Sequence, residues 1–192
     1  EWRKRKRYTG TLYDAVVEGD LAAVNDLLSD GADVHAVQEG GETALMTAAS
    51  NNDASLEIVQ ALIRAGSDVN AILQQAAPYF GSSVLEMSII FEAPVSIIKA
   101  LIEAGANIND PDRISPLTLA SQMGNLQIVM AIIDAGVDVN GNDEGGTPLE
   151  RARTAVIVNT LVSNGADVNV ARGRLSLLAR AIVIHSASVD VV

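Results

Sequence analysis

The chain has 192 residues, a mass of 20.1 kDa and a formal net charge of −11. It contains no cysteine, which excludes a disulfide framework, a cysteine-ligated zinc site and a thiol nucleophile. No apolar run approaches the roughly 18 residues that a membrane-spanning helix requires. Aromatic residues make up only 3% of the chain, so a core must be built from Ala, Leu, Ile and Val.

The charge is unevenly distributed. Residues 1–7 carry a net +4, residues 8–150 a net −18 and residues 151–192 a net +3. An acidic body repels phosphate, so nucleic acid is disfavoured as a ligand of the main surface and a basic protein is favoured. Acidity that serves only solubility is the alternative interpretation.

The first seven residues differ in composition from everything that follows, because residues 2–7 read WRKRKR. Three interpretations stay open: a disordered basic leader, the cytoplasmic flank of a membrane helix, and a nucleic-acid or import signal. The chain opens with Glu1 rather than Met, so we expect further residues upstream.

A hexapeptide with glycine at its second position recurs five times along the chain. Its glycines are spaced by 35, 39, 31 and 29 residues: Gly31, Gly66, Gly105, Gly136 and Gly165. Candidate helix starts recur between them at Thr43, Ser83, Ser115 and Thr147. Helices this short are marginal in water, so each unit needs a neighbour against which to bury its apolar face.

A period near 33 residues, made of a turn and two helices, resembles the ankyrin repeat. The resemblance covers residues 8–192 and implies an all-α solenoid of about six helix-turn-helix units with projecting β-turn fingers. We delimit the units approximately as 8–33, 34–68, 69–107, 108–138, 139–167 and 168–192. The resemblance also implies a protein-binding scaffold, and it does not identify the partner.

Individual repeats depart from the pattern. The third has five extra residues within 71–80, which places Ile72, Leu73, Tyr79 and Phe80 at a finger tip that should be solvated. The fifth is three residues short and lacks the glycine turn, so its first helix should be clipped. The last residues, VDVV, match the start of a second helix and stop midway, so we expect that the chain continues or folds back.

Catalytic and metal-binding sites are not indicated. The histidines, His35 and His185, are 150 residues apart in an array whose units contact only their neighbours, and no third ligand converges on either. We therefore predict no enzyme activity, no cofactor and no metal. The position of the family's loop histidine holds Met46, Glu86, Thr118 and Glu150, which implies weaker ties between repeats. Asn70, Asn109, Asn140 and Asn169 are expected to bond the backbone of their own turns.

The resemblance implies that a partner is gripped by the fingers and by two residues at the end of each first helix. Those helix-end residues are Val17 and Glu18, Ser50 and Asn51, Ile90 and Phe91, and Gln122 and Met123. Tyr79 and Phe80 would form the apolar centre, and the acidic flank would be Glu39, Asp112, Asp143 and Glu144. The rival interpretation is that Tyr79 and Phe80 fold over the irregular third repeat.

The favoured function is a non-catalytic protein-interaction module for a partner with a basic and apolar surface. A concrete version is an inhibitor or immunity-type protein that masks a basic toxin or nuclease. The alternative is a scaffold or adaptor tethered to a membrane through residues 1–7 or a segment that precedes them. An enzyme is the least favoured class. We expect a cytoplasmic location, with membrane tethering as the alternative.

Overall fold

The computed structural model describes residues 9–51, 55–75, 79–110, 113–141 and 146–169. These residues form ten α-helices and two isolated β-bridges, as expected for an all-α fold. The chain divides into two compact units, Glu1–Gly105 and Ala106–Val192, which are described separately. The predicted basic leader and nearly all of the predicted sixth repeat lie outside the described residues.

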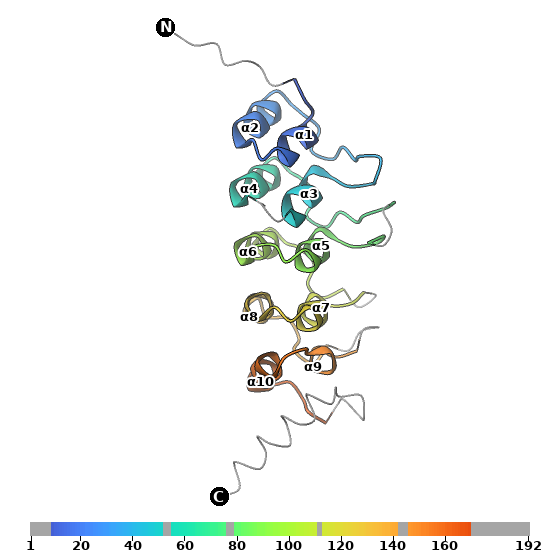
Figure 1. The fold of residues 1–192 in the computed structure, drawn as a ribbon, viewed down its shortest axis with the longest axis vertical. Coiled ribbons are helices and arrows are strands. Elements are labelled where there is room, and N and C mark those ends of the chain that lie inside the picture. Colours follow the sequence, from blue (N-terminus) through green and yellow to red (C-terminus); the bar gives the residue numbers. More distant parts are fainter. Residues whose placement is uncertain (1–8, 52–54, 76–78, 111–112, 142–145, 170–192) are drawn as a thin grey trace, which may run out of the picture. The chain divides into compact units, whose positions relative to one another are not determined.

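Unit 1 contains three antiparallel helix pairs. The first helices, α1, α3 and α5, contact one another in one row, and the second helices, α2, α4 and α6, form the row behind it (Figure 1). The helices are α1 (Leu12–Val17), α2 (Leu21–Ser29), α3 (Ala44–Ser50), α4 (Leu56–Arg64), α5 (Val84–Ile90) and α6 (Val95–Glu103).

Unit 2 contains two helix pairs in its described part. They are α7 (Pro116–Met123) with α8 (Leu126–Asp134), and α9 (Pro148–Arg151) with α10 (Ala155–Ser163). Within this unit α7 contacts α9, and α8 contacts α10. The four residues of α9 confirm the clipped first helix, and the backbone N–H of Arg153 donates to the carbonyl of Ser121 at 3.2 Å to join the ends of α9 and α7.

The predicted helix starts are confirmed. The side-chain oxygens of Thr43, Ser83, Ser115 and Thr147 each accept a hydrogen bond from the backbone N–H three residues later. Such a cap satisfies one of the donors that the first turn of a helix leaves unpaired. Short helices depend strongly on these contacts, because they contain few internal hydrogen bonds of their own.

The core is aliphatic, as the composition requires. The fully buried side chains include Leu45 and Leu85 from first helices and Leu62, Ile98 and Leu101 from second helices. Alanines such as Ala49 and Ala120, both fully buried, let neighbouring helices approach closely. Burial of this kind, shared between adjacent pairs, stabilises helices too short to persist alone.

Two of the four predicted turn asparagines, Asn70 and Asn140, bond differently from the prediction. Within each turn it is the Asp or Asn two residues earlier that accepts the backbone N–H, as Asp138 does for Asn140 at 2.9 Å. The side chain of Asn140 instead donates to the carbonyl of Gly165 at 3.0 Å and accepts from the N–H of Asp167 at 2.7 Å. In unit 1 the side chain of Asn70 likewise donates to the carbonyl of Gly105 at 3.1 Å. These asparagines therefore join consecutive turns.

The fingers of the second and third repeats pack against each other. An antiparallel bridge closes each finger, between Val37 and Thr43 and between Ile72 and Ser83. Gly41 has a φ of +81°, and a Cβ at that position would lie 3.0 Å from the backbone nitrogen of Gln75. Glycine is thus required at residue 41 both by its conformation and by the approach of the next finger.

One predicted tip residue is not at the surface. Leu73 is fully buried, and its backbone hydrogen-bonds Ser82 and Gly81 on the other arm of the finger. The expectation that all four apolar residues of this insertion lie on a solvated tip is therefore wrong for Leu73. Ile72 and Phe80 are exposed, and Tyr79 is half-buried.

Candidate protein-binding surface

Two of the predicted aromatic residues meet in unit 1. The ring of Tyr79, in the finger loop beyond the Ile72–Ser83 bridge, packs edge to face on the ring of Phe91, with centroids 5.1 Å apart and planes at 62°. Phe91 is the C-cap of α5 and follows Ile90, and both are half-buried. The structure therefore brings the finger and the end of the first helix of the third repeat together, a contact that fits both interpretations of Tyr79 given by the sequence.

Phe80 behaves differently from its neighbour. Its side chain is 70% exposed, the highest value among the large apolar residues that the structure describes as exposed. Exposed aromatic side chains next to apolar neighbours are typical of contact surfaces. The two interpretations of the finger thus separate by residue: Tyr79 packs onto Phe91, while Phe80 faces solvent.

The residue after Phe91 has an unusual backbone conformation. Glu92 has a φ of +53°, the one positive value at a non-glycine position among the described residues. The corresponding turns between first and second helices have glycine here, Gly19 in the first repeat and Gly124 in the fourth. A left-handed conformation is unfavourable for a residue with a Cβ, so α5 ends in local strain beside the aromatic pair.

A small groove lies between the ends of α1 and α3. It has a volume of about 130 Å³, and its described lining includes Val17, Glu18 and Asn51, which the resemblance placed on the binding surface. The lining also includes five residues that the sequence did not single out: Val16, Gly19, Ala48, Ser55 and Ile58. No local sequence signal marks these five, because they come from three helices and the turns beside them.

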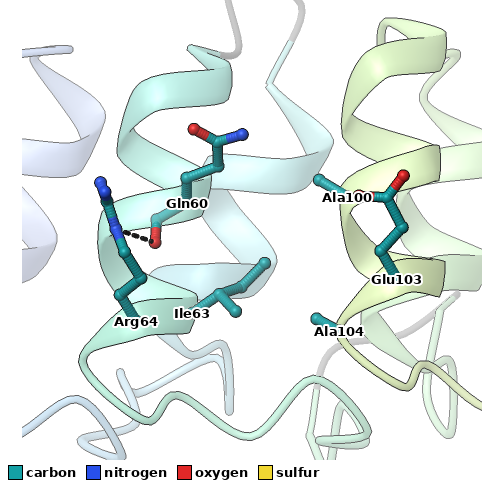
Figure 2. A pocket seen from close by; sticks show the side chains of 6 residues that line it. All are labelled: Gln60, Ile63, Arg64, Ala100, Glu103 and Ala104. Carbon is teal, nitrogen blue, oxygen red and sulfur yellow. Dashed lines mark hydrogen bonds between the residues drawn. The ribbon is translucent and has the colours of Figure 1, made fainter.

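A larger open groove, of about 400 Å³, lies between the second helices α4 and α6. Figure 2 shows Gln60, Ile63 and Arg64 on one side and Ala100, Glu103 and Ala104 on the other. The Arg64 guanidinium donates to the carbonyl of Gln60 at 3.1 Å. This groove was not predicted, and its rim carries one positive and one negative side chain.

The basic residues of the described part of unit 1 lie on its second helices. Arg64 on α4 and Lys99 on α6 are the two Lys or Arg residues of the sequence between residues 9 and 105, and the second helices also carry Asp26, Glu57 and Glu103. The first helices and the fingers and turns that flank them carry only acidic charges in their described residues: Asp14, Glu18, Asp20, Asp33, Glu39, Glu42, Asp68, Glu86 and Glu92. The first-helix side of unit 1 is therefore anionic.

The remaining predicted contact residues are placed individually. Glu39 is exposed on a finger, Asn51 is exposed after α3, and the half-buried Ser50 donates its hydroxyl to the carbonyl of Met46 at 2.7 Å. In unit 2, Gln122 is exposed and Met123 is half-buried at the end of α7. Asp112, Asp143 and Glu144 lie outside the described residues.

The position of the family's loop histidine is the third residue of the first helix of a repeat, and two of the residues found there, Glu86 and Glu150, hydrogen-bond within their own helix start. The carboxylates of Glu86 and Glu150 accept the N–H of Ser83 and Thr147, at 2.6 and 2.8 Å, and so complete capping boxes. The hydroxyl of Thr118 lies 3.5 Å from the carbonyl of Gly146 in the next repeat. A weak tie between repeats thus persists at Thr118.

The described residues show neither a metal-binding cluster nor a membrane-spanning helix. No group of three or more His, Asp or Glu side chains in this part of the chain is arranged to hold a metal ion. None of its helices combines the length and the apolar character that crossing a bilayer requires. His35 is exposed in a turn, and His185 lies outside the described residues.

Comparison with known proteins gives family-level matches. The family described as "Ankyrin repeats (3 copies)" matches residues 12–112 and 85–172. Ankyrin repeat domain-containing protein SAT10 of Stachybotrys chartarum is 28% identical over 183 residues, which cover 91% of this chain and 9% of the relative. Palmitoyltransferase akr1 of Schizosaccharomyces pombe is 30% identical over 147 residues, which cover 60% of this chain and 23% of the relative.

The chain spans less than a quarter of the length of both relatives, so the similarity does not extend to their whole activities. The family match covers most of the chain and agrees with the repeated helix pairs and fingers described above. Ankyrin repeats generally act as non-catalytic protein-interaction modules. The chain therefore belongs to the ankyrin-repeat family, and it has the all-α solenoid fold of a protein-binding module.

Proposed function

We propose that unit 1 binds a partner protein at an aromatic surface made of Phe80, Ile90 and Phe91, with Tyr79 supporting Phe91 from the side. The 70% exposure of Phe80 beside the packed Tyr79–Phe91 pair carries the proposal. Aromatic residues are enriched at protein interfaces, where a few anchor residues supply most of the binding energy. The strained Glu92 beside the pair supports it, because such strain is concentrated at functional positions.

The partner is a basic protein that presents an apolar side chain. Every charged residue on the described first helices and fingers of unit 1 is acidic, whereas the two cations among its described residues, Arg64 and Lys99, lie on second helices. Such a face attracts a basic partner and repels an acidic one. In this role the chain acts as an inhibitor of the immunity type, which covers the basic surface of a toxin or nuclease.

Capture of a partner by the wild-type chain and by Phe80→Ala tests the proposal. The host proteins retained by the immobilised wild-type chain are identified, and the Kd of each purified candidate is then measured. We expect Phe80→Ala to weaken binding about tenfold or more, as loss of an interface anchor does. Met130→Ala is the matched control, because Met130 is a 49% exposed apolar side chain on α8. Equal affinity of the wild-type chain and Phe80→Ala for every candidate partner would contradict the proposal.

A second candidate function is a scaffold tethered to a membrane. Two observations favour it: five basic groups within residues 1–7, and the similarity of the repeats to a region of palmitoyltransferase akr1. Basic clusters bind anionic lipid surfaces, and each Lys or Arg contributes about 1 kcal/mol. Co-sedimentation with phosphatidylserine vesicles should then require residues 3–7 and be lost when those residues are replaced by Gln. Absence of vesicle binding by the wild-type chain at low salt would remove this form of the tether.

A further inference from the structure

We propose that the groove between the ends of α1 and α3 receives basic side chains from the chain's own residues 3–7. The groove is lined by Val16, Val17, Ala48 and Ile58 on its apolar sides and by Glu18, Asn51 and Ser55 on its polar side. The inference does not depend on the proposed function, because its occupant is part of the same chain and its test requires no partner.

The groove has the charge that such an occupant needs. Glu18 is the charged residue among its described lining, and it is exposed. The carboxylate of Glu57 also lies beside the groove, because it accepts a hydrogen bond at 2.9 Å from the hydroxyl of Ser55, which lines the groove. The pKa of Glu57 is below its ordinary value because its own backbone N–H, and then the Ser55 hydroxyl, hydrogen-bond its carboxylate, so Glu57 is ionised at neutral pH.

The helix ends at the groove contribute potentials of both signs, because the groove lies at the C-terminal ends of α1 and α3 and also at the first turn of α4, whose N-terminus is positive. The groove lies where α1 and α3 finish, and neither helix has a basic residue in its last turn. Carbonyl groups at a helix C-terminus carry partial negative charge and favour a nearby cation. The nearest cation of unit 1 in the sequence, Arg64, is the last residue of α4, whereas the groove is at the first turn of that helix.

The groove also has the size of one side chain. Its volume of about 130 Å³ accommodates a single Lys or Arg side chain, and its accessible lining is more polar than apolar. The half-exposed Val17 is the main apolar side chain that the stem can cover, because Val16, Ala48 and Ile58 are buried. A basic side chain can then bury its stem while its charged end remains beside Glu18.

The basic residues are close enough along the chain to reach this groove. α1 is six residues long and spans about 9 Å, so its far end is about that distance beyond Leu12. Arg3 to Arg7 precede Thr9 by two to six residues, and an extended chain covers about 3.3–3.6 Å per residue. Such a short connection gives an effective concentration in the millimolar range, which populates contacts too weak to form between separate molecules.

A spin label attached to the basic segment tests this contact directly. The chain has no cysteine, so Glu1→Cys creates a unique attachment site and leaves all five basic residues in place. Methyl-detected NMR then measures paramagnetic broadening across unit 1 in the full-length chain. We expect broadening at the methyl groups of Val16, Val17, Ala48 and Ile58 at low salt, with at least a twofold reduction at 0.5 M NaCl because exposed charge contacts are screened.

A matched pair of charge variants identifies the receptor. Glu18→Gln should reduce the broadening at the groove at least twofold, while Glu103→Gln should leave it unchanged. Glu103 is also an exposed carboxylate at a groove of unit 1, but that groove includes Arg64. Glu18 and Glu103 are both exposed, and glutamine has the same shape as glutamate, so we expect both variants to retain the fold.

Three results would overturn the proposal. The first is no broadening at these methyl groups in the wild-type background at low salt. The second is broadening that persists in Glu18→Gln. The third is equal broadening at Ile63 and Ala104 of the larger groove, which would indicate non-specific contact with the acidic unit.

Discussion

The ring of Tyr79 meets the ring of Phe91 edge to face, with 5.1 Å between the centroids. Tyr79 comes from a finger and Phe91 is the C-cap of α5, so the contact joins the two parts of the repeat that we propose as the binding surface. The two neighbouring aromatic residues of the finger therefore have different environments. Tyr79 packs onto the end of α5, and Phe80 beside it is 70% exposed.

The two neighbouring aromatic residues should respond differently to truncation. A double-mutant cycle of Tyr79→Ala and Phe91→Ala should give a coupling energy of about 0.5–1.5 kcal/mol in the free energy of unfolding, as edge-to-face pairs do. Phe80→Ala should change that free energy by less than about 0.5 kcal/mol, because the side chain is at the surface. Urea denaturation of the four chains of the cycle and of Phe80→Ala measures both. A large destabilisation by Phe80→Ala would contradict the interpretation that Phe80 does not contribute to packing.

Replacing Glu92 by glycine, the residue found in the equivalent turns, should stabilise the fold. Glu92→Gly should raise the free energy of unfolding by about 0.5–1 kcal/mol, since a left-handed φ of +53° costs a residue with a Cβ about 1–2 kcal/mol and glycine's extra entropy offsets part of the gain. Gly124→Ala is the reciprocal change and should lower the free energy of unfolding by about 1 kcal/mol.

The Gly124 substitution isolates the backbone effect. A Cβ at residue 124 would lie 3.8 Å from the Cβ of Arg153, which is ordinary van der Waals contact, so no steric clash contributes. Thermal or urea unfolding of both variants provides the comparison. Destabilisation by Glu92→Gly would mean that the glutamate side chain makes a contact worth more than the strain.

The side chain of Asn140 should hold two turns of unit 2 together. Its removal in Asn140→Ala leaves the carbonyl of Gly165 and the N–H of Asp167 without this partner, and we expect a loss of about 0.5–1.5 kcal/mol for each bond. Hydrogen exchange at the Asp167 amide reports the local effect. Asn140→Asp is the informative control, because it keeps an acceptor for Asp167 and loses the donor to Gly165. Unchanged exchange at Asp167 in Asn140→Ala would show that the contact contributes nothing.

The N-terminus of α1 should be sensitive to acid. Asp14 accepts hydrogen bonds from the backbone N–H and then the hydroxyl of Thr11, and these lower its pKa below the ordinary value of 3.8. The folded pKa is the depressed one, so the stabilisation is complete above pH 3.8 and is lost as the pH falls through the folded value. NMR titration of the Asp14 carboxyl and the Thr11 amide tests this. A midpoint at or above 3.8 for Asp14 would be the contrary result, and Asp14→Asn should abolish the titration at Thr11.

Local chemistry made most of the fold predictable. Ser115 and Thr147 cap helices because a hydroxyl that precedes a helical segment satisfies a nearby N–H, which depends on residues three positions apart. The short α9 followed in the same way from three missing residues and an absent glycine. Features of this kind require no knowledge of what packs against what.

Contacts between repeats were less accessible to sequence reasoning. Leu73 lies in an insertion that the sequence predicted to be exposed, yet the finger folds so that this side chain is buried. Asn140 was expected to bond its own turn, but Asp138 already does so, which leaves the asparagine for the turn of the next repeat. The groove at Val16 and Ala48 likewise depends on how two helices end side by side.

The placement of Arg64 and Lys99 on second helices has a kinetic consequence. In the described residues of unit 1, the first-helix side carries only acidic charges, whereas Arg64 and Lys99 offset the acidic residues of the second helices, so an approaching basic protein is attracted more strongly to the first-helix side. The association rate constant of such a partner should therefore fall steeply as salt is added, while its dissociation rate, governed by the aromatic contact, changes little.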